Sequence, residues 1–237
     1  MKSEYLDDLK IGGEIMYEGR HREKATDNGF IYPIVNKIIS FIYYINIVEL
    51  IKWITIRFTL LINKGSSDSK YVERKIRRAR NIAIDIFIVL KFLFIGIIWC
   101  GKIDNIFLTP IIIYLLFMNS FVYFYYHIWE EGAIRGEFAT LHRVRRKFIS
   151  LFQSVFFMVL SYGYLFQIPF KGEFKWDGSE ATFSKSLLLS LSNTIPLSYD
   201  SVKAVTEIGN YIKVSQILLS FLFITIILTQ SIPKANK

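Results

Sequence analysis

Two clusters of basic residues have the residue types and spacing to bind phosphate groups. Within KYVERKIRRAR, arginines recur at three-residue steps with further cations beside them, and this cluster consists of Arg74, Lys75, Arg77, Arg78 and Arg80. A second cluster, within HRVRRK, consists of Arg143, Arg145, Arg146 and Lys147. Lysine and arginine neutralise phosphates and give salt-dependent binding. The same composition is common beside membrane spans, where it determines orientation and contacts anionic lipid, and the sequence leaves both interpretations open.

A third group of polar residues follows a short apolar segment in LLLSLSNTIPLSYDS, residues 187–201. This segment is too short to cross roughly 30 Å of hydrocarbon. It is followed by Thr194, Pro196, Ser198 and Asp200, with Glu207 further on. Carboxylates repeated around a symmetry axis concentrate cations, so these residues suit the mouth of an ion pathway.

No residue set typical of a catalytic centre accompanies these groups. The single cysteine, Cys100, excludes an intrachain disulfide framework and a multi-cysteine metal site. The three histidines lack metal-ligand spacing, and paired carboxylates, Ser-His or Cys-His sets and a glycine-rich phosphate loop are missing at usable spacing. We therefore expect no enzyme, no metal and no cofactor.

The elements that position these residues are predicted to be membrane-spanning helices. Apolar residues make up 52% of the 237, and the mean hydropathy is +0.35. Four mainly apolar stretches are about 20 residues long, the length that spans a bilayer. They are 82–100, 106–126, 148–168 and 211–232. The short GKIDN connection predicts that the first two form an antiparallel hairpin.

The distribution of charge predicts how these spans are oriented. Residues 1–81 carry 15 lysines and arginines. The loop 127–147 carries five basic and three acidic residues. The stretch 169–211 carries four basic and five acidic residues. The positive-inside rule then places 1–81, 127–147 and both termini in the cytoplasm and 169–211 outside.

Segment 30–62 is apolar but is interrupted by charged residues, among them Lys37, Glu49, Lys52 and Arg57. This spacing favours an amphipathic helix at the interface or in the cytoplasm over a fifth span. Whether the segment spans stays open.

The first span also contains two charges, Asp85 and Lys91. A charge inside the bilayer is costly and marks a candidate functional residue. Asp85 is expected at the interface, near Arg78 or Arg80, and the role of Lys91 stays open.

The orientation places the short apolar segment between the third and fourth spans, starting and ending outside. A re-entrant element over 182–200, a short helix with an extended return, satisfies this requirement. Non-helical backbone at membrane depth is tolerated only when it is buried in protein or lines water. A polar return therefore implies a water-filled pathway, which several subunits must enclose.

The expected fold class is an all-α polytopic membrane protein with four transmembrane helices and a re-entrant pore helix before the last. The expected parts are an N-terminal region with an amphipathic helix and a basic linker (1–81), a transmembrane hairpin (82–126), a basic cytoplasmic loop (127–147) and a pore module (148–237).

Six residues of the last predicted span recur at alternating three- and four-residue steps and so share one helix face. They are Tyr211, Ser215, Leu218, Leu222, Thr225 and Thr229. Hydroxyls at both ends and leucines between suit a pore wall with a hydrophobic constriction. The alternative is that Ser and Thr pack helix against helix in the membrane.

Residues 148–232 resemble the two-helix pore domain of tetrameric potassium-type cation channels. Phe183, Ser190, Ser192 and Thr194 stand where that family's pore helix carries an aromatic, hydroxyls and the threonine that enters the filter. The family motif Thr-x-Gly-Tyr-Gly-Asp is replaced by TIPLSYD, one residue longer and without the glycines that permit the filter backbone. The resemblance implies a homotetrameric pore, and the missing glycines imply weak discrimination between potassium and sodium. The preference for cations is expected from the carboxylates of Asp200 and Glu207.

The layout of a basic N-terminal region, a hairpin and a degenerate pore also resembles membrane effectors of bacterial anti-phage defence. Among these, the Hailong-type channel is held shut by DNA oligomers that a partner nucleotidyltransferase makes. The resemblance implies a gated channel in the bacterial inner membrane, with single-stranded DNA oligomers bound at the basic clusters. The alternative is a non-conducting anchor or receptor whose basic region binds lipid or a partner protein.

Overall fold

A computed structural model describes residues 29–63, 69–129, 141–178, 180–195 and 197–231. The described chain is mostly helical, as predicted. Three of its helices contain segments long and apolar enough to cross a membrane, namely Tyr71–Cys100, Phe148–Gln167 and Glu207–Thr225. Residues 31–62 provide a fourth if their two helices count as one span. The chain divides into two compact units, Met1–Ile45 and Asn46–Lys237.

The described part of the first unit contains one helix, α2 (Ile31–Ile45). The second unit begins with α3 (Ile47–Ile62), whose N-cap is Asn46. The Asn46 side chain accepts a hydrogen bond from the Val48 N–H at 2.9 Å, which is the usual way an asparagine starts a helix. The single amphipathic helix predicted over 30–62 is therefore two helices, because extended backbone at Asn46 separates them.

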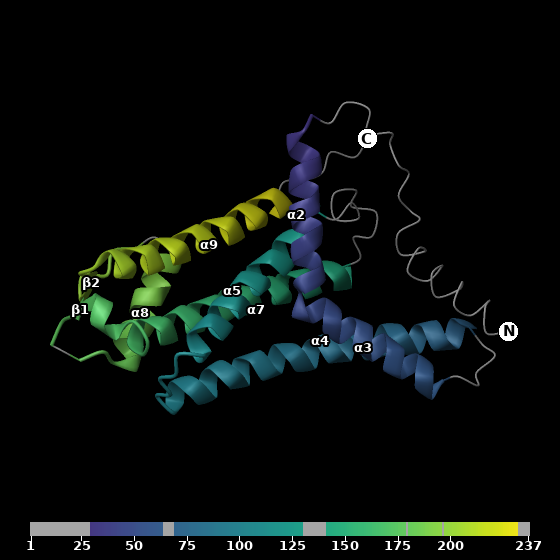
Figure 1. Ribbon diagram of the computed structural model, residues 1–237, viewed down its shortest axis with the longest axis horizontal. Coiled ribbons are helices and arrows are strands. Elements are labelled where there is room, and N and C mark those ends of the chain that lie inside the picture. Colours follow the sequence, from purple (N-terminus) through teal and green to yellow (C-terminus); the bar gives the residue numbers. More distant parts are fainter. Residues whose placement is uncertain (1–28, 64–68, 130–140, 179, 196, 232–237) are drawn as a thin grey trace. The chain divides into compact units, whose positions relative to one another are not determined.

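The helix α4 (Ser69–Cys100) is continuous over 32 residues, so the predicted basic linker and first span share one helix. The helix α3 packs along α4 (Figure 1). The large apolar side chains of α3, such as Trp53 and Phe58, are exposed, whereas Thr59 is buried and Lys52 is half-buried. Apolar side chains outside and polar ones inside are the reverse of the pattern in a water-soluble helix. This distribution suits an apolar environment around α3.

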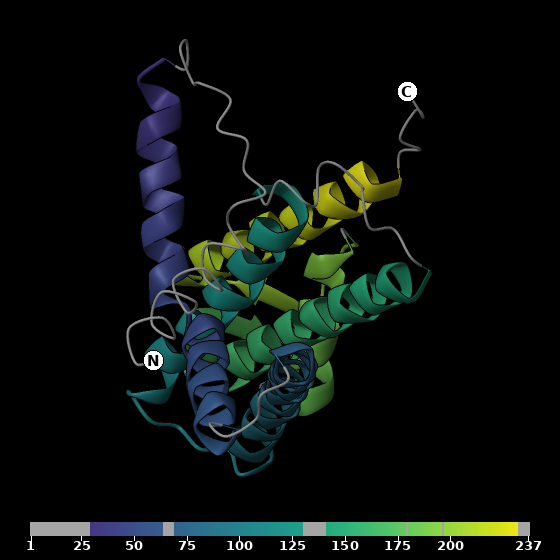
Figure 2. The same cartoon turned by 90° about the vertical axis from the view of Figure 1, so that its right-hand side faces the viewer.

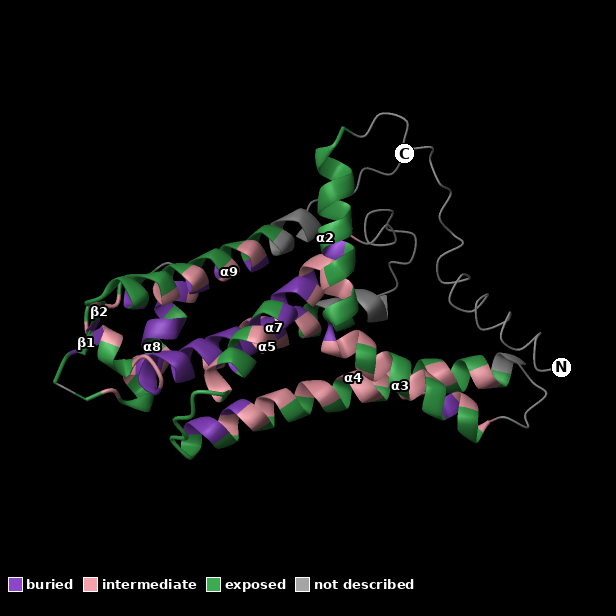
Figure 3. Cartoon of the chain, in the orientation of Figure 1, coloured by how far each residue is buried: buried purple, intermediate pink, exposed green. Residues whose placement is uncertain are grey.

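The helix α5 (Leu108–Phe124) is shorter than the predicted span 106–126, because the chain continues beyond it as the π-helix η1 (Tyr125–Trp129). The helix α7 (Leu141–Gln167) lies at the centre of this unit and packs against α4, α5 and α9 (Glu207–Ser231). Its second half is almost fully buried, with Met158, Tyr164 and Phe166 at 0% exposure (Figure 3). The core therefore follows the second half of α7.

The connection from α7 to α9 contains η2 (Lys171–Glu173), β1 (Phe174–Trp176), α8 (Phe183–Thr194) and β2 (Val202–Ala204). The two strands pair antiparallel, with Phe174 opposite Ala204 and Trp176 opposite Val202. This small sheet was not predicted, since three-residue strands carry almost no periodic signal. The pairing joins the chain just before α8 to the chain just after it (Figures 1 and 2).

Two contacts show that α4 and α7 run in the same direction. Arg146 Nη2, near the start of α7, lies 3.5 Å from Asp85 Oδ1 in the middle of α4, and near the ends of both helices Trp99 Nε1 donates to Gln167 Oε1 at 2.5 Å. The two basic stretches therefore lie at the same end of the unit. This arrangement agrees with the predicted orientation, and the placement of that end in the cytoplasm stays a prediction.

Replacing Gly163 with alanine is expected to destabilise the protein. A Cβ at this position would lie 2.5 Å from Cη2 of Trp99, and the indole cannot retreat without losing its bond to Gln167. Overpacking of this kind costs about 1–3 kcal/mol of unfolding free energy. Thermal unfolding of the detergent-solubilised protein measures the effect. Gly172→Ala is the control, because nothing lies within 4 Å of a Cβ there. Equal Tm values for the two variants would contradict the expectation.

Candidate functional site

The predicted re-entrant segment contains a short helix and a non-helical return. The helix α8 has 12 residues, which corresponds to about 18 Å and so to roughly half a bilayer. It is capped by Thr182, whose Oγ1 accepts a hydrogen bond from the Lys185 N–H at 3.3 Å. After Thr194 the backbone becomes extended at Ile195. The shape of the segment thus follows the prediction, and its depth in a membrane stays a prediction.

The last turn of α8 is bonded to the fully buried Gln216 on α9. Its Nε2 group lies 2.8 Å from the Ser190 carbonyl oxygen, 2.7 Å from Ser190 Oγ and 3.1 Å from Thr194 Oγ1. Its Oε1 atom accepts from Asn193 Nδ2 at 3.2 Å. Ser190 Oγ in turn donates to the Val159 carbonyl on α7 at 2.8 Å. The end of α8 is therefore bonded to both long helices beside it.

The first turn of α8 is held by a second glutamine, Gln167, at the end of α7. Its Oε1 atom accepts from Trp99 Nε1 at 2.5 Å and from Ser186 Oγ at 3.4 Å. Its Nε2 group donates to the Ala181 carbonyl at 3.1 Å. The Trp99 ring also packs on Phe183, with centroids 4.4 Å apart. Sequence reasoning missed both glutamines, although an amide inside an apolar span is a recognisable sign of interhelical bonding.

The residues predicted to line the filter have different environments. The Oγ1 of Thr194 donates to the Ser190 carbonyl at 2.8 Å, so this hydroxyl is turned back onto α8. Ser198 and Asp200 are exposed on the return, and Pro196 lies outside the described residues. Among the described residues, Asp200 makes no ion pair, not even with nearby Lys203. The Asp200 carboxylate is therefore available to solvent.

The predicted face of α9 is only partly exposed in a single chain. Leu218 and Thr225 are exposed, as is Tyr211, whereas Leu222 is half-buried. The Ser215 hydroxyl is bonded to the Tyr162 hydroxyl on α7 at 2.9 Å, and the Thr229 side chain lies outside the described residues. The predicted face is only partly exposed because Gln216 and its neighbours turn one side of α9 toward α7 and α8.

The first basic cluster lies along the first turns of α4. Arg77 pairs with Glu73 at 2.7 Å, and Lys75 donates to Asn63 Oδ1 at 3.1 Å. A hollow of about 700 Å³ lies beside this cluster, and its lining among the described residues is Glu73, Arg74, Arg77, Arg78, Asn81 and Ile82. Arg80 is half-buried. Three arginines of the cluster thus face one surface.

The second basic cluster lies on the first turns of α7. Arg145 and Arg146 are exposed, and the side chains of Arg143 and Lys147 lie outside the described residues. Arg146 pairs with Asp85, in place of Arg78 or Arg80, near which Asp85 was expected. Arg78 shares a helix face with Asp85 but lies two turns, about 10.5 Å, away along the axis, and Arg80 lies on another face. The Arg146–Asp85 pair brings the two clusters to neighbouring helices.

Replacing Gln216 with leucine is expected to loosen the end of α8. The substitution leaves the buried Asn193 amide and the Ser190 carbonyl without this partner, at a cost of about 1–3 kcal/mol for a buried unsatisfied group. Hydrogen exchange of residues 190–194 and the Tm should both report the change. The matched control is Gln153→Leu, because Gln153 is half-buried on α7 and makes no side-chain hydrogen bond with the described residues. If both variants exchange alike, Gln216 does not hold α8.

Comparison with known proteins adds no family to this picture. No protein-family model matches the chain, and no curated protein or solved structure is significantly similar to it. Function therefore has to be inferred from the residues and geometry of the chain itself.

Proposed function

We propose that the chain is one subunit of a gated, oligomeric membrane ion channel. The observation that carries the proposal is α8, a half-length helix with an extended return, bonded between two helices that are long enough to span. In a membrane, such a return has to be buried in protein or line water. Polar residues on the return, Ser198 and Asp200, favour water.

Several copies of the chain would form the pathway, and we propose a homotetramer. In one copy, the exposed face of α9 carries Val214, Leu218, Phe221 and Thr225. A ring of such faces gives a mostly apolar wall, which can close by dewetting. Asp200 then forms a ring of carboxylates at the outer mouth and attracts cations.

The gate is proposed to respond to a cytoplasmic polyanion, such as single-stranded DNA oligomers made by a partner nucleotidyltransferase in an anti-phage system. The hollow beside Arg74, Arg77 and Arg78 supports this part of the proposal, together with the second cluster on the neighbouring helix. Repetition of both clusters around an axis would strengthen binding through avidity. A bacterial inner membrane is the location that this function requires.

Charge reversal of Arg74, Arg77 and Arg78 to glutamate is expected to weaken the response to oligonucleotides by at least about tenfold in concentration, because three phosphate contacts are lost. Planar-bilayer recording of the purified protein, with oligonucleotides added to either side, measures the response.

The matched control reverses three lysines at the β1–β2 end, Lys171, Lys175 and Lys203, and should respond like the parent. An Arg variant that responds like the parent would contradict polyanion gating. A well-folded parent that never conducts would contradict the channel and support the anchor or receptor.

Replacing Asp200 with asparagine is expected to lower the preference for cations, since it removes the carboxylate ring without changing the side-chain size. The parent should distinguish potassium from sodium weakly, with a permeability ratio on the order of 1, because the filter glycines are missing. Reversal potentials in asymmetric KCl and in KCl against NaCl measure both quantities. A parent that reverses at the chloride potential, unmoved by Asp200→Asn, would overturn the assignment.

A further inference from the structure

A second cavity lies within the unit Asn46–Lys237, among α3, α4, α5, η1 and α7, and none of its described lining residues belongs to α8 or α9. Its volume is about 410 Å³, within the range of roughly 300–1,000 Å³ that is usual for small-molecule sites. Most of its wall is apolar, formed by side chains such as Ile84, Phe87 and Ile88 on α4 and Met118 and Val122 on α5. An apolar ligand chain would therefore find contacts along its length.

The polar part of the cavity is centred on Lys91. Its Nζ atom donates to Asn119 Oδ1 at 2.6 Å, and Asn119 Nδ2 donates to the Ser154 carbonyl at 3.1 Å. The second bond fixes the Asn119 oxygen toward the lysine. The ring centroids of Phe157 and Phe92 lie 4.5 Å and 5.8 Å from Nζ. All these partners are neutral, so they orient the ammonium group without compensating its charge.

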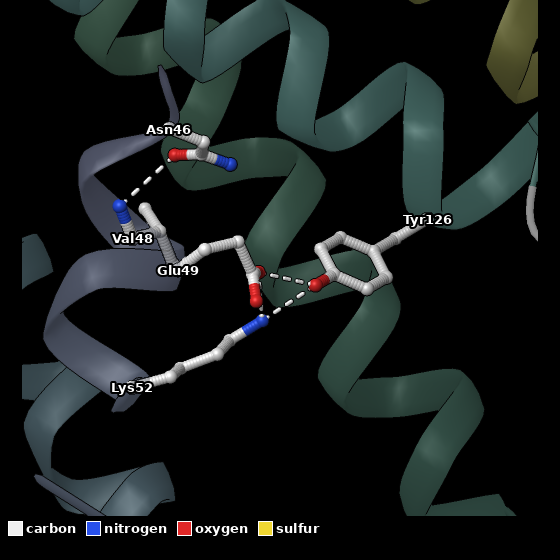
Figure 4. A network of polar contacts seen from close by, with 5 residues as sticks. All are labelled: Asn46, Val48, Glu49, Lys52 and Tyr126. Carbon is white, nitrogen blue, oxygen red and sulfur yellow. Dashed lines mark hydrogen bonds and ion pairs between the residues drawn. The ribbon is translucent and has the colours of Figure 1, made fainter. Parts of the chain in front are cut away.

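The other two cationic side chains that line this cavity are each paired with a carboxylate. Lys52 Nζ lies 2.6 Å from Glu49 Oε1, and the Tyr126 hydroxyl bonds to the same carboxylate at 2.5 Å (Figure 4). Arg146 pairs with Asp85 at 3.5 Å. Of the cationic side chains that line the cavity, Lys91 alone makes no ion pair with a described residue. An uncompensated charge away from water is costly, so this position calls for an anion.

We propose that this cavity binds an anionic membrane amphiphile, a fatty-acid-like molecule whose carboxylate contacts Lys91 and whose chain lies on the apolar wall. The carboxylate would take up the remaining Lys91 donors beside Asn119. A small inorganic anion would leave the apolar wall unused, and a neutral lipid would leave the lysine uncompensated. The inference rests on Lys91 and the apolar wall, so it does not depend on the proposed channel function, although Arg146 of the second basic cluster also lines the cavity.

Binding of oleate to the purified full-length protein, followed by native mass spectrometry, tests the inference. The parent is expected to bind oleate and to bind oleyl alcohol, which has the same chain without the charge, more weakly. Inorganic phosphate should not compete. Lys91→Gln should lower the affinity for oleate by about tenfold or more, as expected for loss of a charge-assisted bond. Lys91→Arg should retain it, and Lys203→Gln, which removes a distant exposed lysine, should match the parent.

A second variant tests the apolar wall without altering the charge. Met118→Trp places a larger side chain in the wall and should lower oleate affinity while Lys91 remains. The inference is overturned if the folded parent does not bind oleate, if Lys91→Gln binds it as tightly as the parent, or if phosphate displaces it. Equal binding of oleate and oleyl alcohol by the parent would likewise exclude a role for the charge.

Discussion

The hydrogen bonds of two buried amides, Gln167 and Gln216, are the interaction on which the arrangement around α8 depends. A 12-residue helix is marginal by itself in water, so it requires tertiary contacts to persist. The two glutamines bond opposite ends of α8 to the ends and sides of the long helices. In an apolar environment an unpaired amide is costly, so each glutamine favours one position of α8 over any shifted one.

The same requirement explains how α9 is rotated. Because Gln216 faces α8, its neighbours along that face, Ser220 and Phe223, are also buried. Leu218 and Phe221 then lie on the opposite, exposed face. This face meets either lipid or other copies of the chain, and its mixture of large apolar residues and Thr225 is compatible with both. The inward hydrogen bonds thus determine which side chains are left for an assembly.

Charge is distributed in this protein so that the two ends of the helical unit differ. Both basic clusters lie at the end where α4 and α7 begin, and the Asp85–Arg146 pair joins them. The β1–β2 end carries acidic and basic residues together, among them Asp200 and Lys203. Between the ends, Lys91 has neutral partners, so the apolar middle of the unit contains a single uncompensated cation among the described residues.

Length and hydrophobicity predicted the helical class and the apolar segments of α4, α7 and α9, and the orientation drawn from charge added the short helix between the last two. These properties are local, because a run of apolar residues specifies a helix of matching length in a membrane. The β1–β2 pairing and the glutamine contacts depended on tertiary structure, and the break at Asn46, although its cap is local, could not be recognised from one asparagine in an apolar stretch. An isolated Asn or Gln has the same composition whether it caps a helix, bonds to a neighbour or faces water. Only the packing of the helices decides which partner each amide meets, and for the same reason Lys91 could be recognised from the sequence as unusual but not matched to Asn119.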